Sequence, residues 1–193
     1  MAETPSTMVE LGTPLPEFSL PDYDGAMHSS TDYAGRPLLV VFICNHCPFV
    51  KHIIKEFSRQ ARDYQDKGVA VVAISSNDIE AHPQDDPAHM KRFAAENDFS
   101  FPYLFDESQE VAQRYRAACT PDFFLFDANH RLVYRGQFDS SRPSNSVAVT
   151  GEDLADAVDR VARGEQVPSD QTPSVGCNIK WKPGAEPSFF GLS

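Results

Sequence analysis

The sequence has little that would suit a membrane or a nucleic acid. Its 193 residues contain no apolar stretch long enough to span a bilayer. Basic residues are in the minority, since 17 Lys and Arg face 28 Asp and Glu, for a formal net charge of −11. Such a charge repels nucleic acids and anionic membrane surfaces. We therefore expect small molecules or proteins as partners.

Other common patterns are also missing. The sequence has no internal repeat, no glycine-rich phosphate loop and no low-complexity tract. Its first ten residues contain two acids and neither a basic cluster nor an apolar core, so we expect no signal peptide and a cytoplasmic location. The four cysteines then predict thiols in a reducing compartment rather than a structural disulfide framework. Redox cycling and metal binding are their expected uses.

One segment carries most of the functional information. Cys44-Asn45-His46-Cys47-Pro48 lies between the apolar run at 38–43 and a helical pattern that starts at Pro48. A thiolate at a helix N-terminus is stabilised by unpaired backbone N–H groups and by the positive end of the helix dipole, which lowers its pKa. The placement therefore predicts a reactive thiol.

The surrounding pattern predicts a β-α-β unit. The runs at 38–43 and 69–74 are typical of strands buried on both faces, and the apolar positions between them repeat at helical spacing up to Gly68. A short hairpin is expected around residues 18–25. Because ligands bind at the carboxyl ends of parallel strands, the two cysteines lie where chemistry is expected.

The rest of the chain predicts three more helices and a second hairpin. The helices are expected from Asp86-Pro87 to about Asn97, over 108–116 and over 151–163, and the hairpin over 123–135. The acidic loop at 78–86, with His82, is expected to be a solvated surface. We divide the chain into a flexible N-terminus (1–10), one domain (11–163) and a proline-containing, irregular C-terminal extension (164–193) that packs on the domain.

A second motif completes a resemblance to a known family. Cys119-Thr120-Pro121-Asp122 precedes a strand-like run, and the order of strand, CNHCPF, helix, strand and Thr-Pro resembles the thioredoxin-like superfamily over roughly residues 10–163. More closely, it resembles the AhpC/TSA (peroxiredoxin-like) branch. The resemblance implies an α/β thioredoxin-like fold, with a central mixed β-sheet flanked by helices. It also implies a cis Thr120–Pro121 bond beside the redox cysteine, with Thr120 able to bind the extended backbone of a partner.

The chain departs from both parent patterns. By resemblance, Cys47 stands where thioredoxin-type proteins have the attacking cysteine, but Val50 replaces their second cysteine. In the peroxiredoxin pattern, Cys47 occupies the place of the peroxidatic cysteine, while Cys44 and Pro121 replace a threonine and an arginine. In peroxiredoxins that threonine and that arginine orient peroxide and stabilise the departing oxygen, so their absence disfavours fast peroxidase chemistry.

We therefore favour a thiol-disulfide oxidoreductase. In this hypothesis the Cys47 thiolate attacks a disulfide, and a second thiol resolves the mixed disulfide. Cys44 is the leading resolving thiol, Cys119 the next and Cys177 a weaker candidate. The supporting residues are expected to be His46, Pro48, Thr120 and Pro121, with Lys51 as a source of positive potential and His46 either lowering the pKa of the thiolate or moving a proton.

Two alternatives stay open. One is a thiol peroxidase with antioxidant activity, in which Cys47 becomes a sulfenic acid that Cys44, Cys119 or Cys177 captures. The other is a metal-binding module built from Cys44, Cys47 and Cys119, with His46 or His52 as a further ligand. The redox hypotheses require no organic cofactor and no metal. They do require a disulfide- or peroxide-bearing substrate and a protein or small-thiol reductant, and the resemblance also allows a homodimer.

Overall fold

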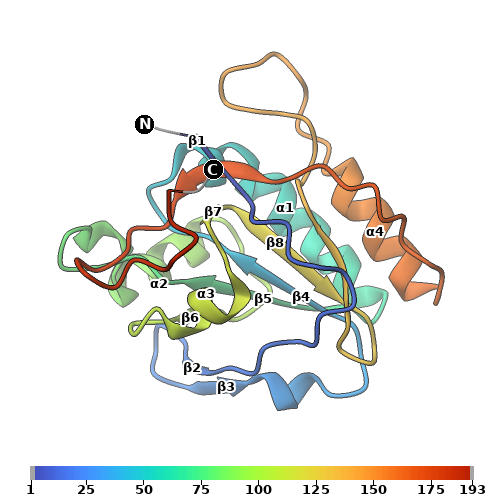
Figure 1. Ribbon diagram of the computed structural model, residues 1–193, viewed down its shortest axis with the longest axis horizontal. Coiled ribbons are helices and arrows are strands. Elements are labelled where there is room, and N and C mark those ends of the chain that lie inside the picture. The colour runs from blue at the N-terminus through green and yellow to red at the C-terminus, as the bar shows by residue number, and fades with distance from the viewer. Residues whose placement is uncertain (1–2, 192–193) are drawn as a thin grey trace.

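A five-stranded mixed sheet forms the centre of the computed structural model, which describes residues 3–191 (Figure 1). The strands lie in the order β6 (Tyr103–Phe105), β5 (Ala70–Ser75), β4 (Leu38–Phe42), β8 (Asp122–Phe126) and β9 (Leu132–Gly136). Strand β4 runs parallel to β5 and antiparallel to β8. The sheet confirms the predicted mixed α/β architecture and the two buried strands of the β-α-β unit.

Both faces of this sheet are covered. Helices α1 (Pro48–Asp66), α2 (Pro87–Glu96) and α4 (Glu152–Ala162) pack on one face through an apolar cluster that includes Leu39 and Val41. The other face is covered by helix α3 (Glu110–Tyr115) and by the hairpin of β2 (Ser19–Pro21) and β3 (Met27–Ser29). Because successive side chains of a strand point to opposite faces, every residue of β4 is buried.

The predicted helix boundaries have local causes. Cys47 is the N-cap residue of α1 and Pro48 is its first residue, where the missing N–H of proline costs no hydrogen bond. The helix ends before Gly68, which has a φ of +87° that favours glycine. At the start of α2, the Asp86 side chain accepts a hydrogen bond from the His89 amide at 2.9 Å.

The two ends of the chain differ from the sequence expectation. Residues 1–10 were expected to be flexible and residues 164–193 irregular, but Glu3–Pro5 form strand β1 and Val175–Asn178 form strand β10. These strands join β7 (Cys119–Thr120) in a second sheet of order β1-β10-β7. Hydrogen bonds to partners more than 50 residues away order these short segments, and no local pattern reveals such partners.

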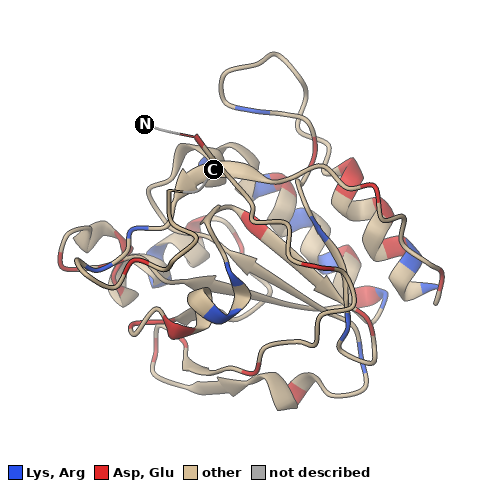
Figure 2. Cartoon of the chain, viewed as in Figure 1, with Lys and Arg blue, Asp and Glu red and all other residues tan. Residues whose placement is uncertain are grey.

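Charged residues lie mainly outside the central sheet. Figure 2 shows acidic and basic residues interspersed on α1 and α4, while the central strands are mostly uncharged. No helix within residues 3–191 has the length and apolar character to cross a bilayer.

Candidate active site

Cys44 and Cys47 lie on the loop between β4 and α1. This loop leaves the carboxyl end of β4, as predicted, and Cys47 ends it as the N-cap of the 19-residue helix α1. The exposed fractions of the two side chains are 1% and 0%. The sequence therefore predicts the position of both cysteines, but not that they are buried.

The Thr120–Pro121 loop contacts both cysteines. The peptide bond between these two residues is cis, as the resemblance implies. When protonated, the thiol of Cys47 donates a hydrogen bond to the Thr120 carbonyl at 3.2 Å, and the Cys44 sulfur lies 3.6 Å from the Thr120 hydroxyl oxygen. Thr120 thus connects the two cysteines through its backbone and its side chain.

The C-terminal strand brings a third thiol to this group. In the antiparallel pairing of β10 with β7, Cys177 lies directly opposite Thr120. Since the Thr120 carbonyl oxygen lies 3.2 Å from the Cys47 sulfur, this pairing puts the Cys177 thiol beside Cys47, where it lowers the pKa of Cys47. Cys119, the residue before Thr120 in β7, instead donates to the Pro121 carbonyl at 3.6 Å. Cys44 and Cys177, rather than Cys119, are therefore the neighbouring thiols that lower the pKa of Cys47.

Hydrogen bonds from neighbouring thiols make Cys47 the most acidic of the four cysteines. Donation from Cys177 and then from Cys44 lowers the pKa of Cys47 well below its usual value, although burial acts in the opposite direction. The same bonds, together with burial, raise the pKa of Cys44 and of Cys177. Burial also raises the pKa of Cys119. Cys47 is accordingly the preferred thiolate, as the sequence predicts.

A buried carboxylate orients the loop from the other side. Asp85 accepts a hydrogen bond from the Asn45 amide at 2.9 Å and one from Nδ1 of His46 at 2.7 Å. Because an ionised carboxylate can only accept, Nδ1 of His46 carries the hydrogen. The same Nδ1 lies 3.9 Å from the Cys44 sulfur, and the His46 ring stacks on His82 at 5.3 Å. The structure thus places His46 beside Cys44.

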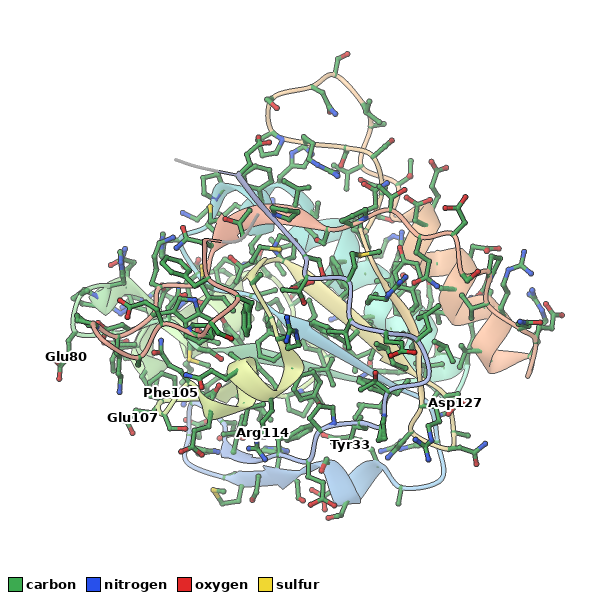
Figure 3. All side chains as sticks on the ribbon, viewed as in Figure 1. Tyr33, Glu80, Phe105, Glu107, Arg114 and Asp127 are labelled. Atoms are coloured by element: carbon green, nitrogen blue, oxygen red, sulfur yellow. The ribbon has the colours of Figure 1, made fainter. Side chains whose placement is uncertain are left out.

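The acidic loop was expected to be a solvated surface, and this prediction is wrong at Asp78 and Asp85. Both are buried, whereas Glu80 is exposed and points outward (Figure 3). The loop follows β5, so it leaves the same carboxyl edge of the sheet as the cysteine loop. That shared edge is the one signal in the sequence that could have pointed to Asp85.

Other expected residues lie near the loop in different settings. Lys51 is exposed and lines a groove with His46 and Lys55. His52 lies 3.1 Å from the Ser141 hydroxyl oxygen. Among the described residues, the one group with metal-ligand geometry is Cys44, His46 and Asp85. The structure does not gather the ligand set of Cys44, Cys47 and Cys119 that the metal-binding alternative requires.

Comparison with known proteins agrees with this geometry. The sequence model of the AhpC/TSA family matches residues 11–135. The chain belongs to the AhpC/TSA family. It is 26% identical to the thiol-disulfide oxidoreductase ResA of Geobacillus thermodenitrificans, over 67% of this chain and 70% of the relative. It is also 30% identical to peroxiredoxin Bcp of Escherichia coli K12, over 65% of this chain and 78% of the relative. This AhpC/TSA protein is therefore a cysteine-dependent oxidoreductase.

Two solved structures extend the likeness beyond the family match. An uncharacterized conserved protein from Geobacillus kaustophilus is 50% identical, with a TM-score of 0.93 over 96% of this chain and 99% of that one. A hypothetical protein from Sinorhizobium meliloti is 48% identical, with a TM-score of 0.92 over 94% of this chain and 100% of that one. Such coverage includes most of the segment after residue 135, which the AhpC/TSA match omits.

Proposed function

We propose that this AhpC/TSA protein exchanges thiols and disulfides, with Cys47 as the attacking thiolate and Cys44 as the resolving thiol. The observation that carries the proposal is the convergence of donors on Cys47, which stabilises its thiolate at a helix N-terminus. The likeness to ResA, a thiol-disulfide oxidoreductase, supports the same chemistry.

The reaction needs only the thiols present at the site. The Cys47 thiolate attacks one sulfur of a substrate disulfide, so that a mixed disulfide forms and the other substrate sulfur leaves as a thiolate. Cys44 then attacks the Cys47 sulfur, the second substrate sulfur leaves, and the proton of Cys44 passes to it. The substrate gains two electrons, and the protein closes a disulfide between Cys44 and Cys47.

The neighbours of Cys44 support its role in the second step. The interaction with Cys47, burial and the charge of Asp85 raise the pKa of Cys44, so it stays protonated while Cys47 attacks. The Thr120 hydroxyl at 3.6 Å favours the Cys44 thiolate. The hydrogen on Nδ1 of His46 is directed to Asp85 at 2.7 Å, so we propose that His46 positions the loop and does not take the Cys44 proton at this nitrogen.

Stopped-flow measurement of thiol loss tests the proposal. Reduced protein is mixed either with a peptide disulfide or with hydrogen peroxide, in the wild type and in Cys47→Ser. We expect disulfide reduction well above the rate of free cysteine, and a loss of more than about a thousandfold in the variant. We expect the peroxide rate to match that of an ordinary thiolate.

The same experiment judges the peroxidase alternative, which the likeness to peroxiredoxin Bcp favours. A peroxide rate far above that of a free thiol, abolished in Cys47→Ser, would replace our proposal with a peroxidase. Undiminished disulfide reduction in Cys47→Ser would remove Cys47 from the mechanism altogether.

A further inference from the structure

Strand β10 covers the nucleophile. Cys47 has no exposed surface, and β10 pairs with β7, the strand whose Thr120 carbonyl oxygen lies 3.2 Å from the Cys47 sulfur. The approach of the two backbones is so close that a Cβ atom built on Gly176 would lie 2.0 Å from the Thr120 carbonyl oxygen. A substrate disulfide can reach the Cys47 sulfur only after this packing opens.

Strand β10 also carries a thiol, that of Cys177. Cys177 lies opposite Thr120 and is buried in the same apolar cluster as Cys44 and Cys47. The strand pairing places the Cys177 thiol beside the Cys47 sulfur, since Cys177 lies opposite Thr120 and the Thr120 carbonyl oxygen is 3.2 Å from that sulfur; one thiol comes from the C-terminal extension and one from the N-terminus of α1. An exchange between them would need no large movement of either backbone.

We propose that Cys177 is an internal exchange partner of Cys47, and that a disulfide between them locks β10 over the active site. The inference rests on the proposed thiol-disulfide exchange. It assigns to the C-terminal extension the role of a redox-controlled cover, closed when the protein is oxidised and free to open when it is reduced.

The locking step is an internal disulfide exchange. It starts from the Cys44–Cys47 disulfide that reduction of a substrate leaves behind. The deprotonated Cys177 sulfur attacks the Cys47 sulfur, the bond between Cys44 and Cys47 breaks, and Cys44 leaves as a thiolate that takes up the proton of Cys177. One S–S bond forms while another breaks, so no external electrons are needed. A thiol reductant then attacks the Cys47–Cys177 disulfide and reopens the site.

Disulfide mapping tests the proposal. Reduced full-length protein is oxidised with a peptide disulfide, quenched with acid, alkylated and mapped by peptide mass spectrometry. We expect the Cys47–Cys177 linkage to dominate in the wild type and in Cys119→Ser, a control that removes another buried cysteine of the same sheet. In Cys177→Ser we expect the Cys44–Cys47 linkage instead.

Two substitutions at residue 177 separate sulfur chemistry from hydrogen bonding. Serine keeps a donor to Cys47 but cannot form a disulfide, whereas alanine can do neither. Titration of thiolate absorbance should therefore show a higher pKa for Cys47 in Cys177→Ala and little change in Cys177→Ser. Neither variant can form the Cys47–Cys177 linkage, so its presence in the wild type is the result that a purely structural role for Cys177 would not explain.

The outcomes distinguish this inference from the proposed function. Exchange that depends on Cys47 but yields only the Cys44–Cys47 disulfide in the wild type would overturn the role of Cys177 and leave the proposed function intact. Exchange that continues at the wild-type rate in Cys47→Ser would overturn both.

Discussion

The two flanks of Cys47 hold buried aspartates that differ in charge at moderately acid pH. On the flank formed by the cysteine loop, hydrogen bonds from His46 and Asn77 counter the effect of burial, which by itself raises the pKa of Asp85, and keep this pKa below its usual value. The loop flank therefore carries a fixed negative charge.

Beside the flank formed by β7 and β10 lies Asp122, the first residue of β8, whose hydrogen bonds do not offset the effect of burial on its pKa. It accepts a hydrogen bond from the Ala118 amide at 3.2 Å, while its Oδ1 atom has no partner among the described residues. Burial raises the pKa of Asp122 to about 7. The strand flank is therefore nearly neutral at moderately acid pH, since Asp122 keeps its proton there.

The pKa values of Asp85 and Asp122 differ, so burial alone does not set the charge of a carboxyl group. Neither side chain has exposed surface, but hydrogen bonds from His46 and Asn77 together with the His46 charge outweigh the effect of burial at Asp85, whereas burial outweighs the hydrogen bonds at Asp122. A charged, polar loop flank suits the tuning of Cys44, whose pKa Asp85 helps to raise. A neutral, close-packed strand flank suits the control of access to Cys47.

We expect a substitution at Gly176 to disturb the packing of the strand flank most. The methyl group of Gly176→Ala cannot fit 2.0 Å from the Thr120 carbonyl oxygen, so β10 must shift. Overpacking of this kind costs about 1–3 kcal/mol. If the substitution destabilises the closed position of β10 relative to the open one by this amount, alkylation of Cys47 by iodoacetamide should accelerate roughly 10–100-fold, since about 1.4 kcal/mol is a factor of ten. Peptide mass spectrometry of the alkylated protein measures the rate.

A second glycine supplies the control. At Gly164 an added methyl group meets nothing within 4 Å, but the φ of +69° strains any other residue. Gly164→Ala should therefore lower global stability without moving β10. Equal acceleration in both variants would mean that alkylation reports general unfolding and not the opening of β10.

The charge state of the strand flank can be tested through the pH dependence of stability. Between about pH 4 and pH 7 the native Asp122 holds a proton that the unfolded chain releases, so its contribution to stability falls as the pH rises. Asp122→Asn removes this dependence. Relative to wild type, the free energy of unfolding of the variant should rise by about 2 kcal/mol from pH 5.5 to pH 8, from 1.5 pH units at 1.36 kcal/mol each.

Urea unfolding at the two pH values measures this difference. Comparison of the variant with the wild type cancels the titration of the other groups. A difference that stayed constant over the range would contradict a raised pKa for Asp122.

The two flanks also differ in how much the sequence reveals. The loop flank is encoded locally, because an apolar strand, two cysteines, a proline and a helical pattern follow one another within 38–66. From these neighbours alone, the position and preferred ionisation of Cys47 can be predicted. The central sheet is predictable for the same reason, since its long apolar runs have strong local patterns.

The strand flank depends on contacts between distant segments. Cys177 lies 57 positions after Thr120 in the sequence, yet the two are paired residues in the second sheet. A four-residue strand between prolines has no pattern that reveals its partner, so the sequence alone makes Cys177 the weakest of the candidate resolving thiols. Asp85 was missed for a related reason, because its burial depends on Asn45 and His46 from another loop.

The smallest expected effect concerns the loop flank. In Asp85→Asn the remaining oxygen can still accept from the Asn45 amide, but the new NH₂ group faces Nδ1 of His46, which is itself a donor. The lost hydrogen bond should lower the free energy of unfolding by about 1 kcal/mol. Because the pKa of Asp85 is lowered, its contribution is fully present above about pH 4 and is lost only as the pH falls further. The loss in the variant should therefore be the same at pH 5.5 and pH 8, in contrast to Asp122→Asn. Asp86→Asn is the matched control, since asparagine also caps a helix. A loss of stability that depends on pH in Asp85→Asn but not in Asp86→Asn would contradict the difference in charge between the two flanks.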